Sequence, residues 1–199
     1  MMFYKGETTQ ILISLLTISL AFSLPFFAQG TIAYGFAIVL LTMGSGFVLH
    51  ELAHKAVAQR FGAVAYYKAW MEGLALAVIM AIATAGKFVF AAPGAVYIHK
   101  KNLTRREDGI ISAAGSFTNI LLAFFFLWLA AGTLAAKGVV SQIGAYGAVA
   151  NSFLAFFNMV PIPPLDGSKV FQWNIIVWAA MFFGAAYLTF VVSLPLIHA

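Results

Sequence analysis

The sequence contains no cysteine, which excludes disulfide bonds and metal sites built from thiolates. It is also poor in charge: 9% of its residues are Asp, Glu, Lys or Arg, whereas a typical soluble domain has about 25%. Hydrophobic residues make up 63% of the 199 residues, and so few charged side chains cannot cover a globule of this size with polar surface. The composition therefore indicates an integral membrane protein.

Basic residues are in small excess, and none of them forms a dense run. The formal net charge is +5. In a membrane protein such an excess reflects topology, because Lys and Arg gather in the cytoplasmic connections. A nucleic-acid-binding arm carries a denser block of like charge. We therefore expect the lipid bilayer, and no nucleic acid, among the partners.

Long apolar runs predict the fold class. A transmembrane helix needs about 20 apolar residues, and five runs provide them: residues 11–28, 32–58, 110–136, 139–160 and 174–196. A sixth stretch, residues 74–86, is apolar but shorter. The sequence predicts an all-α polytopic membrane protein with about five to six hydrophobic segments, folded as a single integral membrane domain over residues 1–199.

The stretch 74–86 decides how the chain is threaded through the membrane. A helix of this length rises about 20 Å, short of the roughly 30 Å apolar core, although adding residues 87–98 would let it cross. If the stretch re-enters instead, ten of the eleven Lys and Arg residues, all but Lys137, share one side, which is then cytoplasmic. His54 and Asp166 then lie at similar depth. We therefore predict a re-entrant or short β element here, with the N-terminus in the cytoplasm.

Two histidines and a glutamate end the second apolar run, in GFVLHELAHKAVAQRFG (46–62). His50 and His54 are four residues apart, so on a helix they share one face. Both imidazoles can then reach one zinc ion, with Glu51 beside it to accept a proton from bound water. Ionisable residues within a span are functional candidates by default. The alternative is a cluster at the membrane edge whose side chains extend to water.

A catalytic zinc ion takes three protein ligands, so a third is needed. Asp166 is the best candidate, because it ends NMVPIPPLDG between two spans at the expected depth of His54, and the prolines deny this stretch a regular helix. His99 lies in the basic stretch YIHKK, where a surface or headgroup contact is expected, and His198 is expected at the opposite face. Solvated charges are expected at the acidic residues of the polar connection: Glu72, Glu107 and Asp108.

HELAH in one span and NMVPIPPLDG in a later one resemble the two signatures of the site-2 protease family of intramembrane zinc metalloproteases. AAGSFTN (113–119) resembles the family's glycine-to-asparagine element, and the resemblance covers about residues 32–170. It implies one Zn²⁺ per chain, held by His50, His54 and Asp166, with Glu51 as the general base. Asn119 matches a family position near the substrate or the tetrahedral intermediate. The alternative for Asn119 is an interhelical hydrogen bond.

The stretch after HELAH fits the family's membrane-embedded β element. Alternation in GAVAYYKAW (62–70) and the proline and glycine of APGAVYI (92–98) favour two short strands. In the family such an element offers an edge to an unwound substrate. The chain departs from the family at Ser116, where a proline often follows the glycine. We expect a compact form without PDZ or CBS domains, and for Asn158 a structural role in the proline-rich break.

The expected function is that of a zinc-dependent endopeptidase that hydrolyses peptide bonds in or near transmembrane helices of membrane-protein substrates. Two alternatives remain. A metal or proton transporter would spread its relay residues across the membrane, whereas the candidates here cluster at one face. An inactive protease-like protein that only binds helices would not need Glu51. The small size favours a prokaryotic plasma membrane, with the active site on its cytoplasmic side, and the sequence does not indicate an oligomeric state.

Overall fold

The computed structural model describes residues 1–89, 93–133 and 138–197. Within these ranges, five helices are long and apolar enough to cross a membrane: Glu7–Gln29, Ile32–Arg60, Arg105–Thr133, Val139–Asn158 and Ile175–Leu196. Large apolar side chains on these helices point outward, for example Trp128 and Ile176, as expected of a lipid-facing surface. The protein is an all-α polytopic membrane protein with one small sheet, as predicted. Lys137 and His198 lie outside the described residues.

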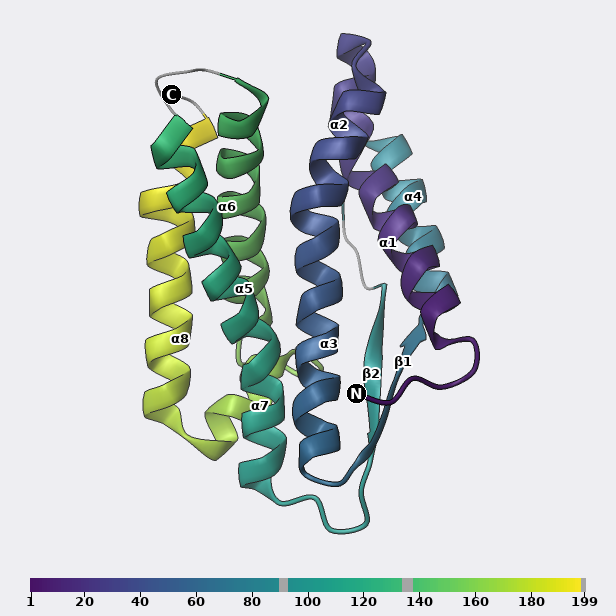
Figure 1. Ribbon diagram of the computed structural model, residues 1–199, viewed down its shortest axis with the longest axis vertical. Helices are drawn as coiled ribbons and strands as arrows, with labels where there is room; N and C mark the ends of the chain where they lie inside the picture. Colours follow the sequence, from purple (N-terminus) through teal and green to yellow (C-terminus); the bar gives the residue numbers. More distant parts are fainter. Residues whose placement is uncertain (90–92, 134–137, 198–199) are drawn as a thin grey trace.

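The first two spans each contain more than one kind of helix. The first consists of α1 (Glu7–Ser23) and the 3-10 helix η1 (Leu24–Gln29). The second consists of α2 (Ile32–Val39), the π-helical turn η2 (Leu40–Gly44) and α3 (Ser45–Arg60). In Figure 1, α2 continues upward from α3, and α3 stands between α1 and α4 on one side and α5, α6 and α8 on the other. The HELAH helix is therefore central in the molecule.

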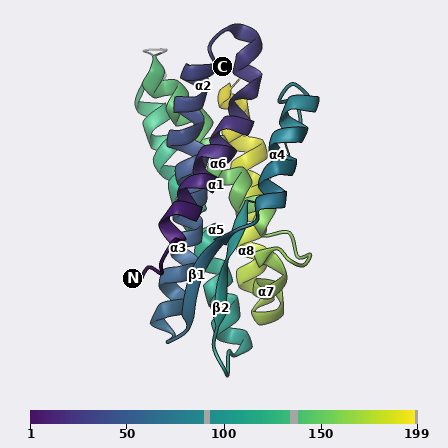
Figure 2. The same ribbon diagram turned by 90° about the vertical axis from the view of Figure 1, so that its right-hand side faces the viewer.

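A two-stranded antiparallel sheet follows α3. Strand β1 (Val64–Ala69) pairs with β2 (Gly94–His99), so that Val64 lies opposite His99 and Ala69 opposite Gly94. The helix α4 (Met71–Ala83) leaves from the Ala69 end (Figure 2). Because the two strands are antiparallel and in register, the chain returns to the side that it left. The re-entrant and β predictions are both confirmed, although residues 90–92 of this segment lie outside the described residues.

The second half consists of α5 (Arg105–Thr133), α6 (Val139–Asn158), α7 (Asp166–Trp173) and α8 (Ile175–Tyr187), which continues as η4 (Leu188–Ser193) and η5 (Leu194–Ile197). Helix α5 begins five residues before the predicted start at 110. The reason is a capping box: Glu107 N–H donates to Thr104 Oγ1 (3.2 Å) and Thr104 N–H donates to Glu107 Oε2 (3.0 Å). Polar residues therefore extend the helix beyond its apolar run.

The first span also begins earlier than its apolar run, at Glu7 instead of residue 11. The Glu7 carboxylate is 2% exposed and forms an ion pair with Lys55 on α3, which is fully buried. The same carboxylate accepts hydrogen bonds from the backbone N–H groups of Tyr4 and Tyr67, both at 2.9 Å. Glu7 thereby ties α1 to α3 and to strand β1, and so fixes the sheet beside the HELAH helix.

Candidate metal centre

His50 and His54 project from one face of α3 toward a carboxylate that a different part of the chain supplies. Their Nε2 atoms are 2.9 Å apart, and Asp166 Oδ2 lies 3.3 Å from His50 Nε2 and 3.0 Å from His54 Nε2. All three ligand atoms lie within 4.8 Å of one another. Ligands about 2.0–2.1 Å from a tetrahedral zinc ion are about 3.3 Å apart. Two imidazoles and one carboxylate at this spacing fit a catalytic Zn²⁺.

The remaining imidazole nitrogens hold the two rings in place. His50 Nδ1 lies 2.7 Å from Asn119 Oδ1, and His54 Nδ1 lies 2.7 Å from the carbonyl oxygen of Ile111. A carbonyl oxygen can only accept, so Nδ1 of His54 carries the hydrogen and its Nε2 lone pair is free for a metal. Such outer hydrogen bonds orient metal-binding histidines. Both rings are therefore held with Nε2 facing the metal-binding group.

One face of α5 contacts both histidines. Ile111, Gly115 and Asn119 follow one another at intervals of four residues, so they lie along one side of the helix. A Cβ atom at Gly115 would collide with the imidazoles of His54 and His50. The glycine of AAGSFTN is thus explained by close approach, because α5 can lie against the two rings only if no side chain stands between them.

Asp166 is the first residue of α7 and follows the proline-rich loop. Two contacts fix this loop: Gly167 packs against the backbone of Met159, and Trp178 Nε1–H donates to the Met159 carbonyl oxygen at 2.8 Å. Burial alone would raise the pKa of the Asp166 carboxyl. The charges and hydrogen bonds of His54 and His50 outweigh that effect and lower the pKa below its usual range. Asp166 is therefore a carboxylate, the form that binds a metal.

Glu51 lies next to the three candidate ligands and also contacts the sheet. Its side chain is 9% exposed, and Oε2 accepts a hydrogen bond from Val96 N–H of strand β2 at 3.1 Å. The strand that follows the re-entrant helix thus comes close to the predicted general base. The edge of β2 and the metal-binding residues form one continuous site.

The other residues singled out from the sequence have different surroundings. His99 is at the end of β2, stacked on Tyr66 and 3.3 Å from its hydroxyl, and it does not belong to the metal-binding group. Asn158 Nδ2 donates to the Leu154 carbonyl oxygen of its own helix at 3.0 Å. Asn119 makes interhelical hydrogen bonds, as one of its two readings expected. Its predicted role toward substrate stays a prediction.

Asn151 on α6 was missed by sequence analysis. It is fully buried, and its Oδ1 accepts a hydrogen bond from Asn119 Nδ2 at 3.0 Å. Its position within an apolar span was a signal in the sequence, because an amide is costly there unless it has a hydrogen-bond partner. Asn158, seven residues later, begins the motif NMVPIPPLDG, whereas no motif contains Asn151.

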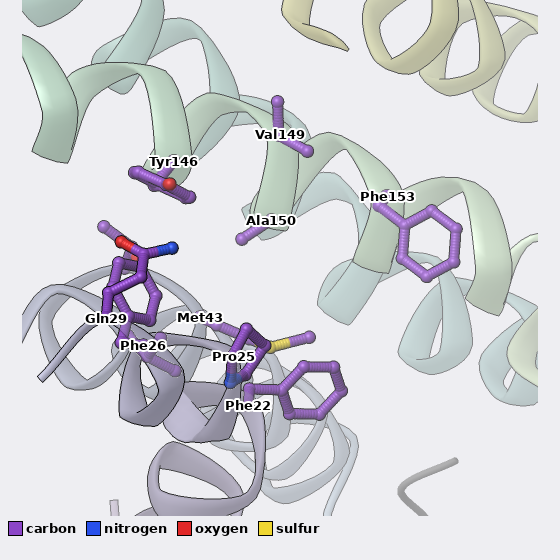
Figure 3. A pocket seen from close by; sticks show the side chains of 11 residues that line it. Phe22, Pro25, Phe26, Gln29, Met43, Tyr146, Val149, Ala150 and Phe153 are labelled. Atoms are coloured by element: carbon purple, nitrogen blue, oxygen red, sulfur yellow. The ribbon is translucent and has the colours of Figure 1, made fainter. Parts of the chain in front are cut away.

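An apolar cavity of about 320 Å³ lies away from the metal-binding residues. Phe22, Pro25 and Phe26 of the first span face Tyr146 and Phe153 of α6 across it (Figure 3). No member of the metal-binding group lines this cavity. The centre of His50, His54 and Asp166 is therefore identified by its donor atoms and not by this cavity.

Comparison with known proteins decides the family. The chain is 42% identical over 195 residues to a protein of Methanocaldococcus jannaschii named Putative zinc metalloprotease MJ0611, and the match covers 98% of this chain and 93% of that protein. The chain belongs to this family of zinc metalloproteases. It is also 30% identical over 149 residues to Putative zinc metalloprotease YwhC of Bacillus subtilis, with 67% of each covered. No protein-family model and no solved structure matches it.

Zn²⁺ is accordingly the cofactor of this metalloprotease, and the predicted ligand set is the group that fits it. Zinc binding would account for the meeting of the two histidines of HELAH and a distant aspartate in a protein whose spans otherwise contain few charges. His50, His54 and Asp166 make three protein ligands. This number is typical of catalytic zinc sites, which keep a position open for water or substrate.

Proposed function

We propose that this zinc metalloprotease is an intramembrane endopeptidase of the site-2 type, which cleaves peptide bonds in or near the transmembrane helices of other membrane proteins. The observation that carries the proposal is the place of the site. His50, Glu51 and His54 belong to a span, all three are buried, and the carboxylate of Asp166 reaches them from the break between two later spans.

The chemistry follows from the residues around the ligand set. When bound, Zn²⁺ supplies Lewis-acid chemistry, because it lowers the pKa of a water ligand and polarises a peptide carbonyl. Glu51 accepts the proton of the attacking water and returns it to the leaving amine. Its place beside His50 and its hydrogen bond from Val96 N–H hold the carboxylate at the site.

The position of strand β2 supports the proposal that the substrate is a membrane protein. The peptide bonds of a transmembrane helix are already hydrogen-bonded within the helix, so the substrate has to unwind before it can be cleaved. An unwound segment can add to the open edge of a sheet. The Val96 N–H group points from β2 to Glu51 and not to β1, so a segment added along that edge would lie beside the general base.

We further propose that the site opens to the cytoplasm of a prokaryotic cell. Several cationic residues flank the end of the molecule where α3 ends and α5 begins: Arg60, Lys100, Lys101, Arg105, Arg106 and Lys169. Positive charge of this kind marks the cytoplasmic side. The two relatives come from an archaeon and a bacterium, which supports a plasma membrane location.

The test uses the purified full-length protein in detergent, beside Glu51→Gln, with a panel of single-span membrane proteins as substrates. We expect wild type to hold about one zinc ion and to cleave, and Glu51→Gln to hold zinc without cleavage. Zinc binding without cleavage of any substrate would overturn the protease proposal in favour of an inactive helix-binding relative. Zinc or proton flux into liposomes would favour a transporter.

A further inference from the structure

We propose that Asn151 of α6 is a positioning residue for the metal ligand His50 and acts on it through Asn119. The inference rests on the proposed zinc site. The three side chains form a chain of hydrogen bonds that crosses from α6 through α5 to α3. Each amide in this chain has only one orientation that satisfies its hydrogen-bond partners. The last contact, between Asn119 and His50, determines which nitrogen of His50 faces the metal.

The orientation of Asn151 is set by two backbone carbonyls. Its Nδ2 donates to the Gly147 oxygen at 2.9 Å and to the Thr42 oxygen at 3.4 Å. Carbonyl oxygens only accept, so the NH₂ group of Asn151 has to lie on their side. Its Oδ1 is then turned toward Asn119.

The orientation of Asn119 follows from that of Asn151. Nδ2 of Asn119 donates to Asn151 Oδ1 at 3.0 Å and to the carbonyl oxygen of Gly46 at 3.1 Å. Both partners are acceptors, so the amide of Asn119 cannot be turned over without facing two acceptors with an oxygen. Its Oδ1 is therefore the atom that meets Nδ1 of His50, at 2.7 Å.

The consequence is a defined form of the His50 ring. With an acceptor against Nδ1, this nitrogen carries the hydrogen and Nε2 keeps its lone pair. Nε2 is the atom that lies beside Asp166 Oδ2 and His54 Nε2. The opposite tautomer would place an N–H group where the zinc ion binds. Asn151 thus contributes to the site without touching the metal.

Because these side chains are buried, each hydrogen bond in the chain is difficult to replace. Asn151 and Asn119 are 0% exposed and His50 is 5% exposed, so bulk water does not replace a lost partner. A Cβ atom at Gly46 would collide with Asn151 Oδ1, so the glycine provides the space in which the amide lies. A buried amide that lost a partner would be left unsatisfied, which is costly in this environment.

The neighbouring polar residue Ser152 provides a matched control. It follows Asn151 on α6, is also 0% exposed, and its hydroxyl donates to the Val149 carbonyl oxygen within the same helix at 3.2 Å. A change at Ser152 therefore perturbs the same buried helix without affecting the hydrogen bonds to Asn119. Its effect reports packing alone.

The experiment is a double-mutant cycle on zinc affinity with the full-length protein in detergent. Metal-free wild type, Asn151→Leu, Asn119→Leu, the double variant and Ser152→Ala are titrated with Zn²⁺ against a chromophoric chelator, and the absorption spectrum of bound Co²⁺ is recorded. We expect Asn119→Leu to weaken zinc binding about 10- to 100-fold and Asn151→Leu about tenfold. The double variant is expected to match Asn119→Leu, and Ser152→Ala to match wild type.

Losses that multiply in the double variant, or wild-type affinity in Asn151→Leu, would overturn the inference while leaving the zinc site intact. Failure of wild type to bind zinc would instead overturn the proposed function. If Asn151→Leu does not fold, Asn151→Ala replaces it, with thermal unfolding of the metal-free forms as the check. A changed Co²⁺ spectrum at unchanged stability supports positioning, and an unchanged spectrum with lower stability contradicts it.

Discussion

His54 of α3 and Asp166 of α7 meet, with Nε2 of the histidine 3.0 Å from Oδ2 of the aspartate. His54 is on α3, near the end of the second span, and Asp166 begins α7, after the fourth span. The pair joins two elements that are far apart in sequence. A zinc ion held between them would therefore link the two halves of the fold as well as serve the proposed reaction.

Removal of the aspartate ligand should abolish tight zinc binding. In Asp166→Ala, only the two imidazoles remain of the described ligand group, and we expect less than one tenth of the zinc content of wild type after dialysis, with no cleavage. Metal analysis of the purified protein measures this. His99→Ala is the control, because His99 stacks on Tyr66 outside the group. Full zinc content in Asp166→Ala would show that another residue is the third ligand.

A methyl group at Gly115 should disturb the ligands directly. The added Cβ would collide with both imidazoles, so we expect Gly115→Ala to weaken zinc binding about tenfold or more, on the scale known for altered support of metal ligands. The matched control is Gly132→Ala on the same helix, where nothing lies within 4 Å of an added Cβ. Equal zinc affinity in the two variants would contradict the close approach of α5.

The ion pair between Glu7 and Lys55 should matter mainly for stability. Lys55→Met leaves the Glu7 carboxylate buried without its cation, and breaking a buried pair in this way costs about 3–5 kcal/mol of unfolding free energy. Denaturant unfolding in mixed micelles measures the loss. The comparison is Lys100→Met, which breaks a partly exposed pair with Glu107 and should cost far less, because solvent screens an exposed pair. The double variant Glu7→Gln, Lys55→Met should recover part of the loss.

Orientation in the membrane can be tested on a chain with no background thiols. Because the natural sequence has no cysteine, single variants such as Lys101→Cys and Gln29→Cys each provide one site for a membrane-impermeant maleimide. We expect intact cells to label Gln29→Cys and not Lys101→Cys, since Gln29 ends the first span and Lys101 lies between β2 and the start of α5, on the proposed cytoplasmic side. Labelling of Lys101→Cys in intact cells would reverse the proposed orientation.

Wild type treated with a strong chelator should lose cleavage together with its zinc. The structure predicts that added Zn²⁺ restores cleavage, because the hydrogen bonds of the His50 and His54 imidazoles to Asn119 and Ile111 do not involve the metal. Activity that persists after the zinc has been removed, as measured by metal analysis, would contradict the metalloprotease mechanism.

Much of this architecture could be predicted from the sequence because it depends on local pattern. Apolar runs of bilayer length indicate spans, and a spacing of four residues places His50 and His54 on one face of a helix whatever the rest of the chain does. The helix starts were less accurate at Glu7 and Arg105. There the decisive interactions are an ion pair to Lys55 and a capping box, and neither contributes to the apolarity of a run.

The sequence by itself determined the membrane class, the spans and the two histidines of the site, since composition and helical periodicity act over a few residues. The sequence also pointed to Asp166, but only the tertiary structure decided that its carboxylate meets them, how the re-entrant segment returns, and which amide orients His50. These depend on close packing between distant elements, made possible where Gly115 and Gly46 bring helices together. Asn151 shows this most clearly, because its role exists only when three helices place their polar groups within hydrogen-bonding distance.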